Sequence, residues 1–191
     1  MNRKKFIGSI AIISVGSLAS YYGLKFFKSI GTPDINYLEK NKALIADLCE
    51  AIIPKTDSPG AKMAMVHEYI IYAISQSRDI KHKNNFINGL KDLQDYSLSK
   101  FNLEFSKLNK SQQSEILKHF QNKAKSYNAK VEKIQNKILG KPFFTILRET
   151  TTIGYCTSVI GAQQGLAYDY VPTKFIACSD YVKGQKSWAT K

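Results

Sequence analysis

The stretch NYLEKNKALIADLCEAIIPKTDSPGA, residues 36–61, contains a helix, its end and the turn after it. Its apolar residues recur at steps of seven, three and four, as on one face of an α-helix, at Leu38, Ile45, Leu48 and Ile52. Proline lacks the amide hydrogen that a helix interior needs, so the predicted helix 36–53 ends at Pro54. The structural turn predicted here contains Pro54, Asp57, Pro59 and Gly60. In a type II turn Pro59 sets φ and Gly60 takes a positive φ.

The helical period continues beyond this turn. It predicts four more helices, over 61–77, 84–101, 111–139 and 142–158. The fourth predicted helix of the chain carries an apolar seam with alternating steps of four and three, as in a coiled coil: Phe120, Ala124, Tyr127, Val131, Ile134 and Ile138. From Gly161 onward the chain is rich in glycine and tyrosine and is predicted to be irregular. No sustained alternating run indicates a strand, so the fold class is all-α, a compact multi-helix domain of about five helices.

The N-terminus has the pattern of an export signal or a signal anchor. The run from Asn2 to Ile7 resembles a twin-arginine signal, with Lys4 in place of the second arginine, so the candidate signal residues are Arg3, Lys4 and Phe6. The 19 residues of the uncharged stretch 6–24 follow. A cleaved signal, an uncleaved anchor and a buried helix remain open. The predicted organisation is a signal or anchor over 1–30, a helical domain over 36–185 and a tail over 186–191, with 25–36 acting as a tether.

The composition points to an anionic partner. The 191 residues include 28 Lys and Arg against 15 Asp and Glu, which gives a net charge of +13. Between Lys107 and Lys141 there are nine lysines and two glutamates. Nucleic-acid recognition is disfavoured, because arginines are few and the aromatic residues fall on the apolar seam. A solvated lysine face, an anionic membrane and an acidic protein surface remain as alternatives.

The sequence shows no recognisable catalytic equipment. None of His67, His82 and His119 stands in a metal-binding motif, and neither a glycine-rich dinucleotide fingerprint nor a P-loop occurs. No catalytic, cofactor-binding or metal-ligating residue is therefore predicted in this chain.

Two features indicate contact with another subunit. A stripe of small residues on the last predicted helix would let another backbone approach closely, at Thr151, Gly154, Ser158 and Gly161. This candidate subunit interface competes with simple packing inside the chain. Among the three cysteines, Cys49 and Cys156 fall on helices and are expected in the core. Cys178 falls in the irregular C-terminal part, so it is the candidate for an intersubunit disulfide, with an intrachain bridge and a free thiol as alternatives.

Three blocks of the sequence resemble the gluconate 2-dehydrogenase subunit 3 family. The first is the helix and turn from Leu44 to Ala61, and the second combines residues 86–93 with Phe105, Leu108 and Gln112. The third runs from Pro142 through Gly154, Tyr155 and Ser158 to Tyr168. Their order and spacing carry the resemblance over residues 40–185.

The resemblance implies a non-catalytic small subunit of an exported, membrane-associated dehydrogenase that oxidises a sugar, a polyol or a sugar acid. In such complexes a glucose-methanol-choline-type flavoprotein large subunit holds FAD, and a cytochrome c subunit often takes the electrons. The small subunit would carry the export signal and stabilise the large subunit in the periplasm or cell envelope. The alternative is a stand-alone, membrane-anchored helical protein that binds anionic lipid or an acidic protein surface.

Overall fold

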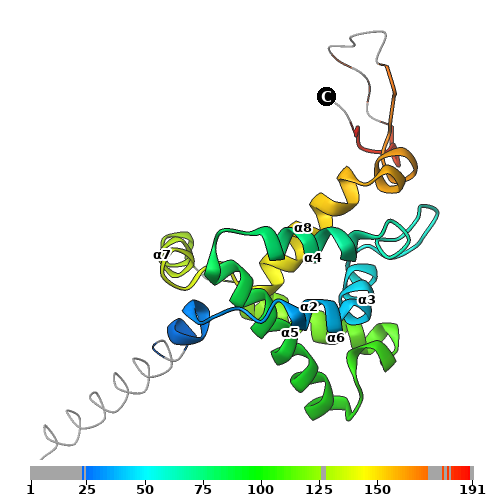
Figure 1. Cartoon of the computed structure of the whole chain (residues 1–191). Helices are drawn as coiled ribbons and strands as arrows, with labels where there is room; N and C mark the ends of the chain where they lie inside the picture. Colours follow the sequence, from blue (N-terminus) through cyan, green and yellow to red (C-terminus); the bar gives the residue numbers. More distant parts are fainter. Residues whose placement is uncertain are drawn as a thin grey trace, which may run out of the picture.

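A computed structural model of the chain describes residues 23, 25–125, 128–171, 178, 180 and 182–189 (Figure 1). Its elements are α2 (Asn36–Lys40), α3 (Lys42–Ile52), α4 (Val66–Gln76), α5 (Ile80–Phe101), the 3-10 turn η1 (Phe105–Lys107), α6 (Lys110–Ala124), α7 (Ala129–Leu139), α8 (Phe143–Thr157) and the π-helical turn η2 (Gly161–Gly165). Within the described residues the only pairing of strand type is an isolated bridge between Ala167 and Trp188. The predicted all-α class is confirmed, with shorter and more numerous helices than the five expected.

Helix α8 lies at the centre of the domain and packs against α3, α4, α5 and α6 (Figure 1). Its side chains Ile146 and Leu147 are completely buried. The other large side chains with the same complete burial are Leu38, Ile45, Leu48, Ile70, Ile74, Phe86, Leu90, Leu93, Phe105 and Ile116. All five predicted helices thus contribute side chains to one core, and the fifth of them, observed as α8, lies at its centre.

Several helices begin and end where a side chain or a glycine can satisfy the terminal backbone groups. Asp79 Oδ1 accepts a hydrogen bond from Lys81 N at 2.9 Å, so α5 begins at Ile80 and not at the expected residue 84. A reciprocal capping box between Asn109 and Gln112 starts α6. Helix α7 ends at Gly140, whose φ of 79° suits glycine.

The predicted helices 36–53 and 61–77 are interrupted near their N-termini. Asn41 divides the first into α2 and α3, because its side chain donates to Tyr37 O at 2.8 Å and its backbone leaves helical geometry. Residues 61–65 form turns before α4, and Met65 there adopts a left-handed conformation with φ of 53°. The apolar periodicity was unaffected by either break, so it could not locate them.

The predicted helix 111–139 and its continuous seam are wrong. The chain breaks between α6 and α7, where Lys125 and Asn128 are extended and the Asn128 side chain caps α7. Phe120 is buried in the core, whereas Val131, Ile134 and Ile138 of the seam are exposed. The regular spacing in the sequence therefore spans two separate helices, of which α6 packs in the core and α7 is largely exposed.

Residues 25–30 are helical and fastened to the domain, so the predicted tether is wrong for this segment. The buried Asn84 side chain donates from Nδ2 to Ser29 O at 3.0 Å and to Gly31 O at 2.5 Å. Asn88 Nδ2 donates to Lys28 O at 3.3 Å. The candidate signal residues Arg3, Lys4 and Phe6 lie outside the described residues. In the part of the chain that is described, no helix combines the length and the apolar character needed to cross a bilayer.

Candidate subunit interface

The loop between α3 and α4 contains the four predicted turn residues and is held by a carboxylate that the sequence analysis missed. Glu50 Oε1 accepts a hydrogen bond from Lys55 N at 2.8 Å, and Glu50 Oε2 accepts one from Lys62 N at 2.9 Å. A third hydrogen bond, from Ala61 N to Ile53 O at 2.9 Å, closes the loop at its base. The sequence offered one signal for this role. Glu50 lies in the last turn of α3, where the helix dipole disfavours a negative charge. An acid at such a position indicates that a nearby donor binds it.

Gly60 is needed for space and not for a positive φ, so the predicted type II geometry is wrong. Within the described chain, positive φ values at glycine occur at Gly140 and Gly184. A Cβ atom on Gly60 would lie 2.3 Å from Glu50 Oε1 and 2.4 Å from Oε2. Glycine therefore lets the Glu50 carboxylate come close enough to bind both backbone amides of the loop.

Tyr155 joins this loop to α8 and to η2. Its buried hydroxyl donates to Pro59 O at 2.7 Å. Its ring lies so close to Gly165 that an added Cβ would be 2.4 Å from the hydroxyl oxygen. The Ser158 hydroxyl donates to Tyr155 O at 2.8 Å and accepts from Gly161 N at 2.9 Å. Two of the sequence blocks that carry the family resemblance, 44–61 and 142–168, thus meet in space through structural hydrogen bonds.

The stripe of small residues points into this chain. Thr151 is completely buried and its hydroxyl lies 3.8 Å from Cys49 Sγ on α3. A Cβ atom on Gly154 would meet Tyr69 at 2.6 Å and Val66 at 3.0 Å, and one on Gly161 would meet Tyr155 O at 2.0 Å. Ser158 is half-buried. In the isolated chain these residues let α4 and η2 approach α8, and their contact with a partner subunit stays a prediction.

Large apolar side chains stand exposed on and beside the paired helices α4 and α8. They are Met65, Tyr69, Tyr72, Ile153 and Val159, which we call the α4–α8 apolar surface. Tyr72 is 67% exposed and Val159 is 70% exposed. Tyr69 lies against Gly154, which places the two helices in direct contact here. Tyr69 and Tyr72 lie three residues apart on α4 and so share one face of that helix. A shared exposed apolar face is typical of a protein–protein contact.

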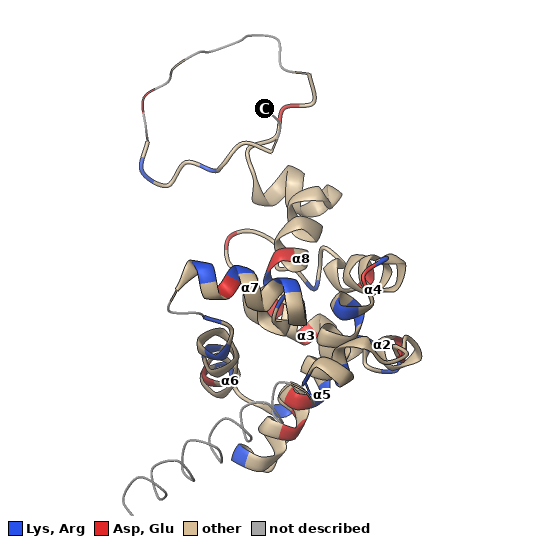
Figure 2. Cartoon of the chain, turned by 90° about the vertical axis from the view of Figure 1, so that its left-hand side faces the viewer, with Lys and Arg blue, Asp and Glu red and all other residues tan. Residues whose placement is uncertain are grey.

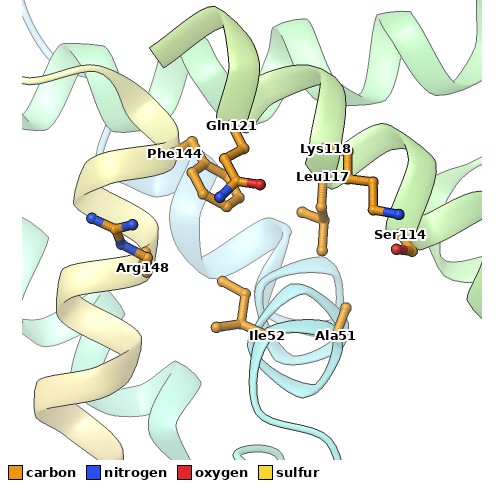
Figure 3. A pocket seen from close by; sticks show the side chains of 8 residues that line it. All are labelled: Ala51, Ile52, Ser114, Leu117, Lys118, Gln121, Phe144 and Arg148. Carbon is orange, nitrogen blue, oxygen red and sulfur yellow. The ribbon is translucent and has the colours of Figure 1, made fainter. Parts of the chain in front are cut away.

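A groove of about 270 Å³ opens between α3, α6 and α8 (Figure 3). It is lined by Ala51, Ile52, Ser114, Leu117, Lys118, Gln121, Phe144 and Arg148. Ile52 of α3 and Leu117 of α6 both extend into it, and exposed Arg148 and Lys118 supply positive charge (Figure 3). The lining residues combine apolar side chains with two basic ones, and none of them is acidic. The groove therefore offers apolar side chains with positive charge beside them.

The three histidines have different surroundings. Burial lowers the pKa of His67 and of His82, which favours the neutral imidazole in each. His67 Nδ1 is buried and has no hydrogen-bond partner among the described residues. His119 stacks on Tyr96, with ring centroids 4.2 Å apart. Within the described residues no three His, Cys, Asp or Glu side chains cluster in a way that could hold a metal ion.

The three cysteines differ in burial and none forms a disulfide within the chain. Cys49 is completely buried in the core, as expected, and burial raises the pKa of its thiol to about 12. Cys156 is only half-buried, and Cys178 is exposed. The exposed position keeps Cys178 available for the predicted intersubunit disulfide.

Alkylation should therefore separate the three thiols. Treated with iodoacetamide at about pH 8, the folded chain should be modified first at Cys178 and last at Cys49, because only the thiolate reacts and Cys49 remains protonated and enclosed. Mass spectrometry of tryptic peptides gives the order, and the unfolded chain, in which all three should react alike, is the control. Early modification of Cys49 would contradict the described core.

Comparison with known proteins agrees with this arrangement. The family model described as gluconate 2-dehydrogenase subunit 3 matches residues 39–173. No curated protein and no solved structure matches the chain. The matched range begins in α2 and continues beyond η2, so it contains the Glu50-bound loop, the Tyr155 junction and the central helix. The chain therefore belongs to the gluconate 2-dehydrogenase subunit 3 family.

Proposed function

We propose that the chain is the non-catalytic small subunit of an exported, FAD-dependent dehydrogenase that oxidises a sugar, a polyol or a sugar acid. Membership of the family implies a subunit of a multi-subunit dehydrogenase complex. FAD would be held by a glucose-methanol-choline-type flavoprotein large subunit, and a cytochrome c subunit would accept the electrons. The role proposed for this chain is to bind the large subunit, to stabilise it and to accompany it out of the cytoplasm.

The observation that carries the proposal is the α4–α8 apolar surface. Burying large apolar side chains releases free energy on association, and aromatic residues such as Tyr69 and Tyr72 are enriched in protein interfaces. The groove with Arg148 and Lys118 adds a place for acidic side chains of the same partner. The exposed groups of the α4–α8 apolar surface and of the groove are thus suited to binding a partner. Glu50 and Tyr155 instead form hydrogen bonds within the chain that stabilise the fold.

Co-purification tests this function. The chain is co-expressed with candidate flavoproteins of the glucose-methanol-choline type and isolated through a tag on the chain. A stoichiometric complex with flavin absorbance is expected. The double variant Tyr72→Asp, Val159→Asp should lose at least about 90% of the bound flavoprotein, because charge would be buried in an apolar contact.

Two exposed leucines outside this surface provide a matched control, since Leu98 and Leu103 are also large apolar side chains. The variant Leu98→Asp, Leu103→Asp should retain the complex. Equal retention by both variants would show that the partner binds elsewhere, and failure of every flavoprotein to bind would contradict the proposed function.

Export is tested separately, at the candidate signal. Replacement of Arg3 and Lys4 by glutamine should hold both the chain and its bound flavoprotein in the cytoplasm, because export signals need a positive N-terminal region. Fractionation of cells, with the flavin activity and an immunoblot as readouts, gives the distribution. Unchanged recovery outside the cytoplasm would contradict the twin-arginine-like route.

A further inference from the structure

Helix α7 exposes an apolar stripe that the rest of the described chain does not cover. Val131, Ile134 and Ile138 follow one another at helical spacing and are 45%, 59% and 51% exposed. The only buried residue of α7 is Leu139 at its end. A helix of 11 residues with so little packing is marginally stable in water. Its apolar face therefore needs another surface to rest on.

A row of lysines runs beside this stripe. Lys130, Lys133 and Lys137 repeat at the same spacing of three and four residues, on the flank next to Ile134. Glu132 lies on the other flank and is the one acid of α7. An apolar stripe bordered by lysines is the pattern of helices that lie in the plane of a membrane interface. The long lysine side chains can reach lipid headgroups while the stripe enters the acyl boundary.

Side chains of α5 hold α7 at its C-terminal end. Lys81 Nζ donates to Ile138 O at 2.7 Å and to Lys137 O at 3.3 Å. Asn85 Nδ2 donates to Leu139 O at 2.7 Å and to Lys141 O at 3.0 Å. These bonds satisfy the terminal carbonyls, and the Lys81 cation also suits the negative end of the helix dipole. They fix the helix without using its apolar stripe.

The N-terminal segment 25–30 lies beside the same end of α7. Lys81 Nζ, which binds α7, is 5.7 Å from the centre of the Phe26 ring. Figure 1 shows the segment and α7 on the same side of the molecule, the side that faces the viewer in Figure 2. Phe27 and Ile30 are exposed on this segment, which also carries Lys25 and Lys28. In the sequence it directly follows the uncharged stretch 6–24.

We propose that α7 and residues 25–30 together form a contact surface for anionic phospholipid. Apolar side chains from both elements would enter the interface, and lysines of both would meet the negative headgroups. The uncharged stretch 6–24, which ends where this surface begins, gives the reason to prefer a bilayer over a protein as the occupant. This inference does not depend on the identity of the dehydrogenase partner.

A tryptophan placed in the stripe tests the contact. In the full chain with Trp188→Phe, Ile134→Trp supplies the only tryptophan, and Tyr72→Trp on α4 supplies a matched exposed control. Each is reconstituted in vesicles in which about one third of the lipid is phosphatidylglycerol. Brominated lipid should quench Ile134→Trp at least about threefold more strongly than Tyr72→Trp, because only the first would lie at the acyl boundary. Equal quenching would overturn the proposal.

Charge variants test the lysine row by the same readout. Lys130→Gln, Lys133→Gln and Lys137→Gln together should reduce the quenching of Ile134→Trp to the level of the Tyr72→Trp control. The same change at Lys40, Lys55 and Lys110, which are exposed outside this surface, should leave it unchanged. Circular dichroism of each variant verifies that the domain remains folded. Persistent quenching in the first triple variant would exclude an electrostatic contact.

A protein occupant has a different signature. If the flavoprotein covered α7, adding it without lipid would shift the emission of Ile134→Trp to shorter wavelength and would prevent quenching by vesicles. That result would overturn the lipid surface while supporting the proposed complex, so the two proposals fail independently.

Discussion

Alanine in place of Gly89 should destabilise the domain by about 2 kcal/mol, although alanine is the better helix former. Gly89 lies inside α5, where α8 crosses it. An added Cβ would lie 2.1 Å from Cγ and 2.3 Å from Cβ of Phe143. Because Phe143 is buried and its ring packs against Phe86 and Phe120, it cannot move without disturbing the core. In a thermal melt the midpoint should fall by roughly 4–8 °C.

Gly31→Ala is the matched control for Gly89→Ala. The nearest atom to a Cβ at Gly31 is Phe27 O at 3.8 Å, which is an ordinary contact. Its melting temperature should change little, with an effect below about 0.5 kcal/mol. If space is the cause at Gly89, Phe143→Leu should cost less in the Gly89→Ala background than in the original chain. A stable Gly89→Ala protein would mean that α5 and α8 are farther apart than described.

Glu50→Ala should destabilise the domain by about 1–3 kcal/mol, because the backbone amides of Lys55 and Lys62 lose their acceptor. Gly60→Ala should have an effect of similar size, since its Cβ would displace the same carboxylate. The two changes should not add. Once Glu50 is alanine, the methyl group at Gly60 has nothing to displace, so the double variant should be about as stable as Glu50→Ala alone.

Urea unfolding of the four proteins in this cycle gives the coupling energy, which we expect to exceed about 1 kcal/mol. Glu39→Ala, at an exposed acid on α2, serves as the control and should be nearly neutral. Additive effects at Glu50 and Gly60 would contradict the steric role of Gly60. They would mean that the cost of Gly60→Ala comes from the backbone conformation of Gly60 and not from displacement of Glu50.

Helices could be predicted from the sequence because burial of one face imposes a period that survives in the residue order. Ile45, Leu48 and Ile146 follow that period and are completely buried. Breaks could not be predicted, because they depend on single hydrogen bonds, such as that of the Asn41 side chain to Tyr37 O. The apolar period also does not predict whether the apolar face of a helix is buried by the rest of the chain. The buried Phe120 and the exposed Ile134 carry the same pattern.

The candidate site was less accessible to sequence reasoning. Prolines and a glycine marked the loop correctly, but the carboxylate that holds it comes from Glu50, on the preceding helix. The small residues Thr151 and Gly154 indicated close approach, and the sequence alone could not decide between α4 of the same chain and a second subunit. Exposure of Tyr72 and Ile153 follows from how α4 and α8 pack together, which only the assembled fold determines.

The central position of α8 has a consequence for the order in which the domain is made. Among the described α-helices, α8 is the last to leave the ribosome, yet α3, α4, α5 and α6 all pack against it. The Tyr155–Pro59 hydrogen bond joins positions 96 residues apart, and the Thr151–Cys49 contact joins positions 102 residues apart. Closing such distant contacts is slow and must wait for the far end of the chain. A nascent chain that stops before Pro142 therefore lacks the helix against which α3, α4, α5 and α6 pack, so this core cannot be completed until α8 has been made.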